Sequence, residues 1–246
     1  MTNEPVGNWT WQAMEPSDKD VLRPHLQLCH LPQGDVLMHA GDAVDVVYFP
    51  VSAEIANVIR YSDGKTAVAA TVSRNGLTGL AAFLAEEPIG WDLCVQIGGQ
   101  AWRMPSDVLR RQCRESPDLT SLLMTLTHEN QVEASVNAAC YLRHDLTSRM
   151  ARWLLTTQER TGQSELPVKQ GDIADWMGVQ RTSVVASSRF LASHGAIQNR
   201  RGRIAIINRQ VLKAYACECY GRVARRLDPH PDAGGKRPAG PSDADA

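Results

Sequence analysis

Residues 166–207 read LPVKQGDIADWMGVQRTSVVASSRFLASHGAIQNRRGRIAII, and this stretch decides the fold of the C-terminal part of the chain. Its apolar spacing predicts a short helix over 170–177, and Gly178 then supplies the residue needed for a left-handed turn. A second helix is expected over 181–191, with Val184, Val185 and Leu191 as candidate core positions. Two helices joined by a tight glycine turn form a helix-turn-helix, whose second helix can enter the major groove of DNA.

A basic turn follows the second helix. Residues 199–203 (Asn-Arg-Arg-Gly-Arg) separate the strand-like Ile197 from the apolar run 204–207, which predicts a β-hairpin, or wing. Its arginines would add mainly sequence-independent, salt-sensitive affinity for phosphates; they are Arg200, Arg201 and Arg203.

Position also assigns a role to the polar residues of the two helices. Arg181 begins the second helix, where an arginine can make paired hydrogen bonds to guanine, worth about 1–3 kcal/mol of base discrimination. Thr182 and Ser183 can reach bases or phosphates nearby. Gln170 is placed for a phosphate contact, and Arg189, two turns along, is a weaker candidate. The alternative is a winged helix that binds a protein partner and leaves its arginines in solvent.

The distribution of charge favours a polyanionic partner. Residues 145–227 contain 14 lysines and arginines against six aspartates and glutamates, a balance of +8. Because the whole chain has a net charge of −1, the rest of the chain carries a net charge of −9. A basic segment joined to an acidic one is typical of a protein whose basic part meets nucleic acid.

Short antiparallel strands are predicted between residues 31 and 105. Alternating apolar residues flank Ser62-Asp63-Gly64-Lys65, a strong hairpin signal because glycine accepts the positive φ of the turn. Residues 93–97 and 101–103 are expected to pair as another hairpin across Gly98-Gly99. Strands at this spacing favour a small antiparallel barrel or sandwich.

A long amphipathic helix of about 25 residues is predicted from Pro117 onward. The helix can pack its apolar stripe on its own barrel, or pair it with the same helix of a second subunit, and we favour pairing. The stripe consists of Leu119, Leu122, Leu123, Leu126, Val132, Val136 and Ala139.

The cysteines and histidines predict no metal site. Cys217 and Cys219 are spaced Cys-x-Cys, with His194 and His230 elsewhere, and two thiols on one expected helix do not make a tetrahedral site. The chain also lacks a P-loop, a Rossmann fingerprint, a nucleophile elbow and a zinc-protease motif. We therefore expect neither an enzyme nor a bound cofactor.

No secretory signal or membrane-length apolar run is evident, so the expected location is cytoplasmic, with no membrane partner.

The order of these elements resembles the Crp/Fnr superfamily of bacterial transcription regulators over roughly residues 20–225. The strings that carry the resemblance are Gly41-Asp42 before Val47-Tyr48-Phe49-Pro50, Asp63-Gly64-Lys65, Gly76-Leu77-Thr78-Gly79-Leu80, Leu166-Pro167 with residues 173–179, and Arg200-Arg201-Gly202-Arg203-Ile204.

The resemblance implies an α+β chain with four parts. These are a cyclic-nucleotide-binding-like antiparallel β-barrel of jelly-roll type (1–116), a dimerisation helix and hinge (117–144), a winged helix-turn-helix (145–227) and a tail (228–246) whose composition predicts disorder. It implies a homodimer on a two-fold symmetric site in double-stranded DNA, with RNA polymerase as a candidate partner. An effector that prefers one hinge state would reorient the winged helices about residues 143–145.

Departures from the family narrow these expectations. Gly76, Leu77, Thr78, Gly79 and Leu80 would line the effector pocket. Relatives that bind cyclic nucleotides carry a glutamate for the ribose there and an arginine for the phosphate several residues later. Leu77 occupies the glutamate position and residues 86–93 contain no arginine, so we expect no tight cyclic-nucleotide binding and leave the small-molecule effector unidentified.

Two other departures concern the oxygen-sensing branch and the DNA site. Cys29 is the only cysteine in the first 90 residues, which argues against an N-terminal iron–sulfur centre. Thr182 and Ala186 stand where many relatives carry a glutamate and a second arginine. Only Arg181 carries over, so we expect a DNA site different from that of the best-known members.

Overall fold

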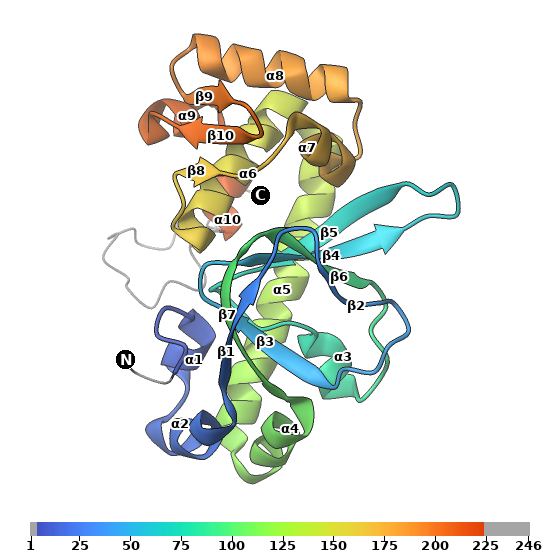
Figure 1. The fold of residues 1–246 in the computed structure, drawn as a ribbon, viewed down its shortest axis with the longest axis vertical. Helices are drawn as coiled ribbons and strands as arrows, with labels where there is room; N and C mark the ends of the chain where they lie inside the picture. Colours follow the sequence, from blue (N-terminus) through green and yellow to red (C-terminus); the bar gives the residue numbers. More distant parts are fainter. Residues whose placement is uncertain (1–3, 224–246) are drawn as a thin grey trace, which may run out of the picture.

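The computed structural model describes residues 4–223, and the predicted disordered tail 228–246 lies outside them. One long helix, α5 (Pro117–Arg143), connects a strand-rich N-terminal half to a C-terminal half whose helix α8 (Arg181–Ser193) lies at the outer end of the molecule, beside a small sheet (Figure 1). Within residues 4–223, no helix combines the length and apolarity needed to cross a bilayer.

The N-terminal half contains two antiparallel sheets, with strand orders β1-β7-β3 and β2-β6-β4-β5. No ladder of hydrogen bonds joins the two sheets within the described residues, so they form an open two-sheet structure and not the closed barrel that the resemblance implied. The strands are β1 (Gln27–Leu31), β2 (Val36–Met38), β3 (Val46–Pro50), β4 (Glu54–Arg60), β5 (Thr66–Val72), β6 (Asp92–Ile97) and β7 (Gly99–Pro105). The helices are α1 (Trp9–Ala13), α2 (Pro16–Leu22), the 3-10 turn η1 (Arg23–His25), α3 (Leu80–Ala85) and α4 (Ser106–Glu115).

The hairpin predicted across residues 62–65 is confirmed. Strands β4 and β5 pair antiparallel up to Arg60 and Thr66, and Gly64 adopts a φ of +80° in the turn. The turn is closed by the Tyr61 amide, which donates to the carbonyl of Lys65 at 2.9 Å.

The hairpin predicted across Gly98-Gly99 is wrong. Strand β6 pairs with β2 and β4, whereas β7 pairs with β1 and β3 in the other sheet. The two glycines are therefore a crossing between sheets, where the backbone passes very close to residues 52–53. A Cβ at Gly99 would lie 2.6 Å from the backbone nitrogen of Ala53, so only glycine fits.

The predicted long helix is confirmed as α5, and its two halves have different surroundings. Ser116 caps its start by accepting a hydrogen bond from the Leu119 amide at 3.1 Å. Leu119, Leu123 and Leu126 are buried in the core of the N-terminal half. The C-terminal half of the apolar stripe is only partly covered, since Val132 and Val136 are half-buried and Ala139 is exposed.

The C-terminal half has its own hydrophobic core, which includes Met150, Ile173, Val184 and Leu212. Its elements are α6 (Leu146–Thr161), β8 (Glu165–Leu166), α7 (Gln170–Met177), α8 (Arg181–Ser193), β9 (Ile197–Arg200), β10 (Arg203–Ile206), α9 (Arg209–Tyr215) and α10 (Cys219–Val223). The three strands form one antiparallel sheet in the order β8-β10-β9.

Candidate nucleic-acid interface and a cysteine–histidine cluster

The helix-turn-helix is formed by α7 and α8. The carboxylate of Asp172 accepts the backbone N–H of Lys169 at 3.0 Å and so caps the start of α7. Gly178 ends α7 in the left-handed conformation, with a φ of +64°, as its position in the sequence predicted. The turn is closed by the Val179 amide, which donates to the carbonyl of Ala174 at 3.0 Å.

One face of the second helix, α8, packs on the core of the C-terminal half. Val184 and Leu191 are fully buried, while the predicted core residue Val185 is half-buried. The hydroxyl of Thr147 on α6 donates to Ser187 on α8 at 3.0 Å. This mounting leaves the opposite face of α8 in solvent at the outer end of the molecule (Figure 1).

The wing is confirmed as the hairpin of β9 and β10, and it is tied to α8. Gly202 turns the chain with a φ of +72°. The hydroxyl of Ser188 on α8 donates to the side-chain oxygen of Asn199 on β9. The wing and the second helix therefore form one unit.

The structure brings the predicted DNA-contacting arginines to one end of the molecule, but some of them form ion pairs within the chain and others do not. Arg200 and Arg203 share one acidic partner, Glu165, at 3.0 Å and 3.5 Å. Within residues 4–223, the exposed arginines Arg181, Arg189 and Arg201 make no ion pair. The remaining candidates are Thr182 and Ser183, both exposed, and Gln170, which is half-buried.

The predicted effector residues, Gly76 to Leu80, are all buried and lie against the start of the chain. The side-chain amide of Asn8 donates to the carbonyl of Gly76 at 2.8 Å and to that of Pro50 at 2.9 Å. The Thr78 hydroxyl accepts the backbone N–H of Tyr48 at 3.0 Å. The polar atoms of this segment thus serve internal packing.

A polar network joins the N-terminal half, through β4, β5 and α5, to α6 of the C-terminal half. Arg160 on α6 makes a buried ion pair with Glu133 on α5 at 2.7 Å and donates to Thr71 on β5 at 2.9 Å. Glu54 on β4 accepts the hydroxyl of Thr157 on α6 at 3.1 Å. Burial raises the pKa of Glu54 to about 7, because the nearby Arg160 is already paired with Glu133 and opposes the shift only in part.

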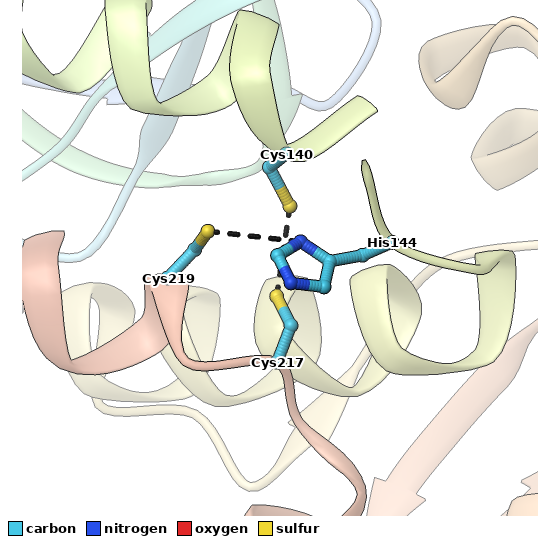
Figure 2. Close-up of side chains that lie close together, drawn as sticks. All are labelled: Cys140, His144, Cys217 and Cys219. Atoms are coloured by element: carbon cyan, nitrogen blue, oxygen red, sulfur yellow. Dashed lines mark hydrogen bonds between the residues drawn. The ribbon is translucent and has the colours of Figure 1, made fainter. Parts of the chain in front are cut away.

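Four metal-ligating side chains meet where α5 ends. Figure 2 shows Cys140, His144, Cys217 and Cys219 pointing toward a common centre, and their ligand atoms all lie within 4.8 Å of one another. This cluster contradicts our expectation, from the sequence, that Cys217 and Cys219 belong to no metal site, for which only His194 and His230 were weighed as partners. His194 lies at the end of α8, and His230 lies outside the described residues.

A local signal for this cluster was present in the sequence. Cys140 and His144 are four residues apart at the end of a predicted helix, which places them on one face. The distance of 77 residues between Cys140 and Cys217 hid the connection. Burial raises the pKa of Cys140 to about 12, although the charge of Arg152 acts against this.

Fold and site together define a winged-helix DNA-binding protein with a two-sheet sensor-like domain and a long connecting helix. The family model of the cyclic nucleotide-binding domain matches residues 28–116, and that of the Crp-like helix-turn-helix domain matches residues 148–215. The chain belongs to the Crp/Fnr family of transcription regulators.

Individual relatives are distant. The CRP-like cAMP-activated global transcriptional regulator of Mycobacterium tuberculosis is 23% identical over 195 residues, covering 76% of this chain and 87% of that protein. The structure of FixK2 from Bradyrhizobium japonicum matches with a TM-score of 0.65 and 17% identity, over 78% of this chain and 98% of that one. The c-di-GMP-responsive regulator CLP of Xanthomonas campestris matches with a TM-score of 0.62 and 13% identity, over 79% and 100%. The two structures share the fold of this chain.

Proposed function

We propose that this regulator acts as a homodimer that binds a two-fold symmetric DNA site through the start of α8 and the wing. We further propose that its sensor domain does not respond to a cyclic nucleotide. RNA polymerase stays a predicted partner of the DNA-bound dimer.

The observation that carries the DNA-binding proposal is the free first turn of α8. Arg181, Thr182 and Ser183 are exposed there, and Arg181 makes no ion pair within residues 4–223. An arginine that has no internal partner loses no ion pair when it binds a guanine edge. In the wing, Arg201 has the same freedom, whereas Arg200 and Arg203 must leave Glu165 to contact a phosphate.

Pairing of α5 supports the homodimer. An exposed stripe runs along this helix in steps of four and three residues, the spacing of a coiled-coil seam. It includes Met124, 60% exposed, and Leu142, 87% exposed, which would otherwise leave large apolar side chains in water. The full stripe is Met124, His128, Gln131, Ser135, Ala138 and Leu142. It lies on a different face from the leucines buried in the chain's own core.

The segment from Gly76 to Leu80, predicted to bind an effector, supports our proposal that no cyclic nucleotide controls this protein. The Mycobacterium tuberculosis relative is cAMP-activated by name, but here Leu77 is fully buried at the position of the ribose-binding glutamate. The nearest arginine in sequence, Arg74, lies beside Gly162 at the end of α6. A phosphate in this buried segment would have no cation, and burying an unpaired charge is strongly unfavourable.

A selection of genomic fragments tests the DNA-binding proposal, using the purified full chain at about 0.15 M salt. Wild-type protein is expected to enrich an inverted repeat. Arg181→Ala should relax the preference at one base pair per half-site, by about 1–3 kcal/mol.

Arg201→Ala is the matched control, because Arg201 is also exposed and makes no ion pair within residues 4–223 but lies in the wing. It should weaken binding on all sequences alike and lower the salt dependence by about one phosphate contact. Enrichment without an inverted repeat, or an unchanged base preference in Arg181→Ala, would contradict the proposal.

A further inference from the structure

The cluster at the end of α5 has the composition and spacing of a structural metal site. Cys140 lies in the last turn of α5, and His144 is the residue directly after that helix. Cys217 lies just before α10, and Cys219 begins it. The Cys140 and Cys217 sulfurs are 3.5 Å apart, and the Cys219 sulfur is 3.8 Å from Nδ1 of His144 (Figure 2).

These two distances are close to the edges of a zinc tetrahedron, and the bound of 4.8 Å on the others leaves ligands that need to move only slightly inward to bind an ion. Zinc lies about 2.3 Å from thiolate sulfur and about 2.0 Å from imidazole nitrogen, which places two sulfurs about 3.8 Å apart and a sulfur and a nitrogen about 3.5 Å apart. An iron–sulfur cluster interposes several metal and sulfide atoms between its thiolates and needs them further apart. The geometry points to a Cys3His site for a single Zn²⁺, formed by Cys140, His144, Cys217 and Cys219.

The surroundings of the four ligands fit a closed structural site. All three cysteines are buried, and with His144 they supply four ligands, so no coordination position is left open for water. Nε2 of His144 lies 4.0 Å from the carboxylate of Glu218, the kind of outer partner that orients a metal-bound imidazole.

Charge balance gives a second reason. Zinc with three thiolates and one neutral imidazole carries a net charge of −1. Arg152 is buried close enough for its charge to act on Cys140 and Cys219. Its Nη1 donates to Asn137 at 2.8 Å, while its buried Nε has no partner among the described residues. An anionic centre beside this guanidinium would offset the cost of burying it.

The position of the site gives it a role, which rests on the proposed function. Only His144 and Asp145 separate α5 from α6, so they are the hinge between the dimerisation helix and the DNA-binding half. Two ligands come from the hinge end of α5 and two from the end of the DNA-binding half. A bound ion would therefore fasten the winged helix to α5 and hold one orientation of the two recognition helices in the dimer.

Cobalt titration of the full chain tests the site. The protein is stripped with a chelator under a thiol reductant and titrated with Co²⁺ alone, then with Zn²⁺. We expect one Co²⁺ per chain, with the strong visible absorption of tetrahedral cobalt and its thiolate charge-transfer bands, and displacement of cobalt by one Zn²⁺.

Variants assign the ligands. Cys140→Ser and Cys219→Ser should lose the thiolate bands or bind cobalt far more weakly, whereas Cys94→Ser, a half-buried cysteine on β6, should behave as wild type. Circular dichroism of each variant distinguishes loss of metal binding from loss of the fold. The titration of the wild-type protein tests the site even if a variant fails to fold. Failure of wild type to bind cobalt, equal binding by the ligand variants, or iron–sulfur absorption in the isolated protein would each overturn the zinc site. So would a Cys140–Cys217 disulfide that persists under reductant.

DNA affinity tests the role separately. Zinc-loaded protein is expected to bind the selected inverted repeat about tenfold or more tightly than stripped protein, within the usual range of coupling between sites. If zinc-loaded and stripped protein bind the DNA with equal affinity, although the first is shown to hold zinc, the orienting role is refuted but the zinc site is not. Arg181-dependent DNA binding by a protein that binds no metal would refute the site and leave the proposed function standing.

Discussion

Glu54 shows how one buried side chain makes the stability of this protein depend on pH. It lies fully buried between β4 and α6, and one of its oxygens has no hydrogen-bond partner among the described residues. Because burial raises the pKa of Glu54 to about 7, the folded protein holds a proton that the unfolded chain has released above its ordinary pKa of 4.5. The stabilisation is complete below pH 4.5 and is lost as the pH rises through 7.

Glu54→Gln should remove this dependence, because glutamine imitates the neutral acid at every pH. The free energy of unfolding of wild type should fall by about 3 kcal/mol more than that of the variant between about pH 5 and 8. Urea unfolding followed by circular dichroism at several pH values measures it. Glu115→Gln, at an exposed glutamate at the end of α4, should keep the wild-type slope, and parallel slopes for wild type and Glu54→Gln would contradict the argument.

At the scale of elements, α5 presents a buried face and an exposed face. Leu119, Leu123 and Leu126 belong to the chain's own core, so the first part of the predicted stripe is unavailable for pairing. The exposed stripe from Met124 to Leu142 is the face that remains for a second subunit. The sequence left open whether α5 packs on its own domain or on a partner. The structure shows the first for one face, and we propose the second for the other.

Ser135→Glu should weaken the dimer by at least about tenfold, because two like charges would face each other across the symmetry axis. Sedimentation equilibrium gives the dissociation constant, and affinity for the inverted repeat should fall with it. Thr125→Glu is the control, matched in exposure and in its hydrogen bond to the helix backbone. Thr125 is exposed on the same helix and donates to a carbonyl four residues earlier at 2.9 Å, as Ser135 does, but it lies off the stripe. Equal effects of the two changes would mean that the seam lies elsewhere.

At the scale of the whole molecule, the segment from Gly76 to Leu80, which we predicted to bind an effector, is packed against the chain's own N-terminal residues. The side-chain amide of Asn8, which precedes α1, donates to the carbonyls of Gly76 and Pro50, and the segment contributes no cation. Neither cyclic AMP nor cyclic GMP should therefore bind the full chain with micromolar affinity. Calorimetric titration checks this directly, and an increase of the unfolding temperature on adding either nucleotide would be the contrary result.

Sequence reasoning succeeded where the signal was local and failed where two distant segments had to meet. Gly178 and Gly64 were assigned correctly because a left-handed turn favours glycine whatever surrounds it. Gly98-Gly99 carried the same signal but has another cause, the close approach of residues 52–53 from a different strand. Turn chemistry alone cannot distinguish a hairpin from a crossing between sheets.

By itself, the sequence determined the winged helix-turn-helix, the long helix and the arginines of the candidate DNA interface, because periodicity, caps and turns depend on neighbours along the chain. Only the tertiary structure decided the strand partners of β6 and β7 and the division of α5 between its own core and an exposed seam. It also brought Cys140 and His144 to Cys217 and Cys219. Each of these depends on contacts between residues far apart in the chain, which packing of the whole molecule sets.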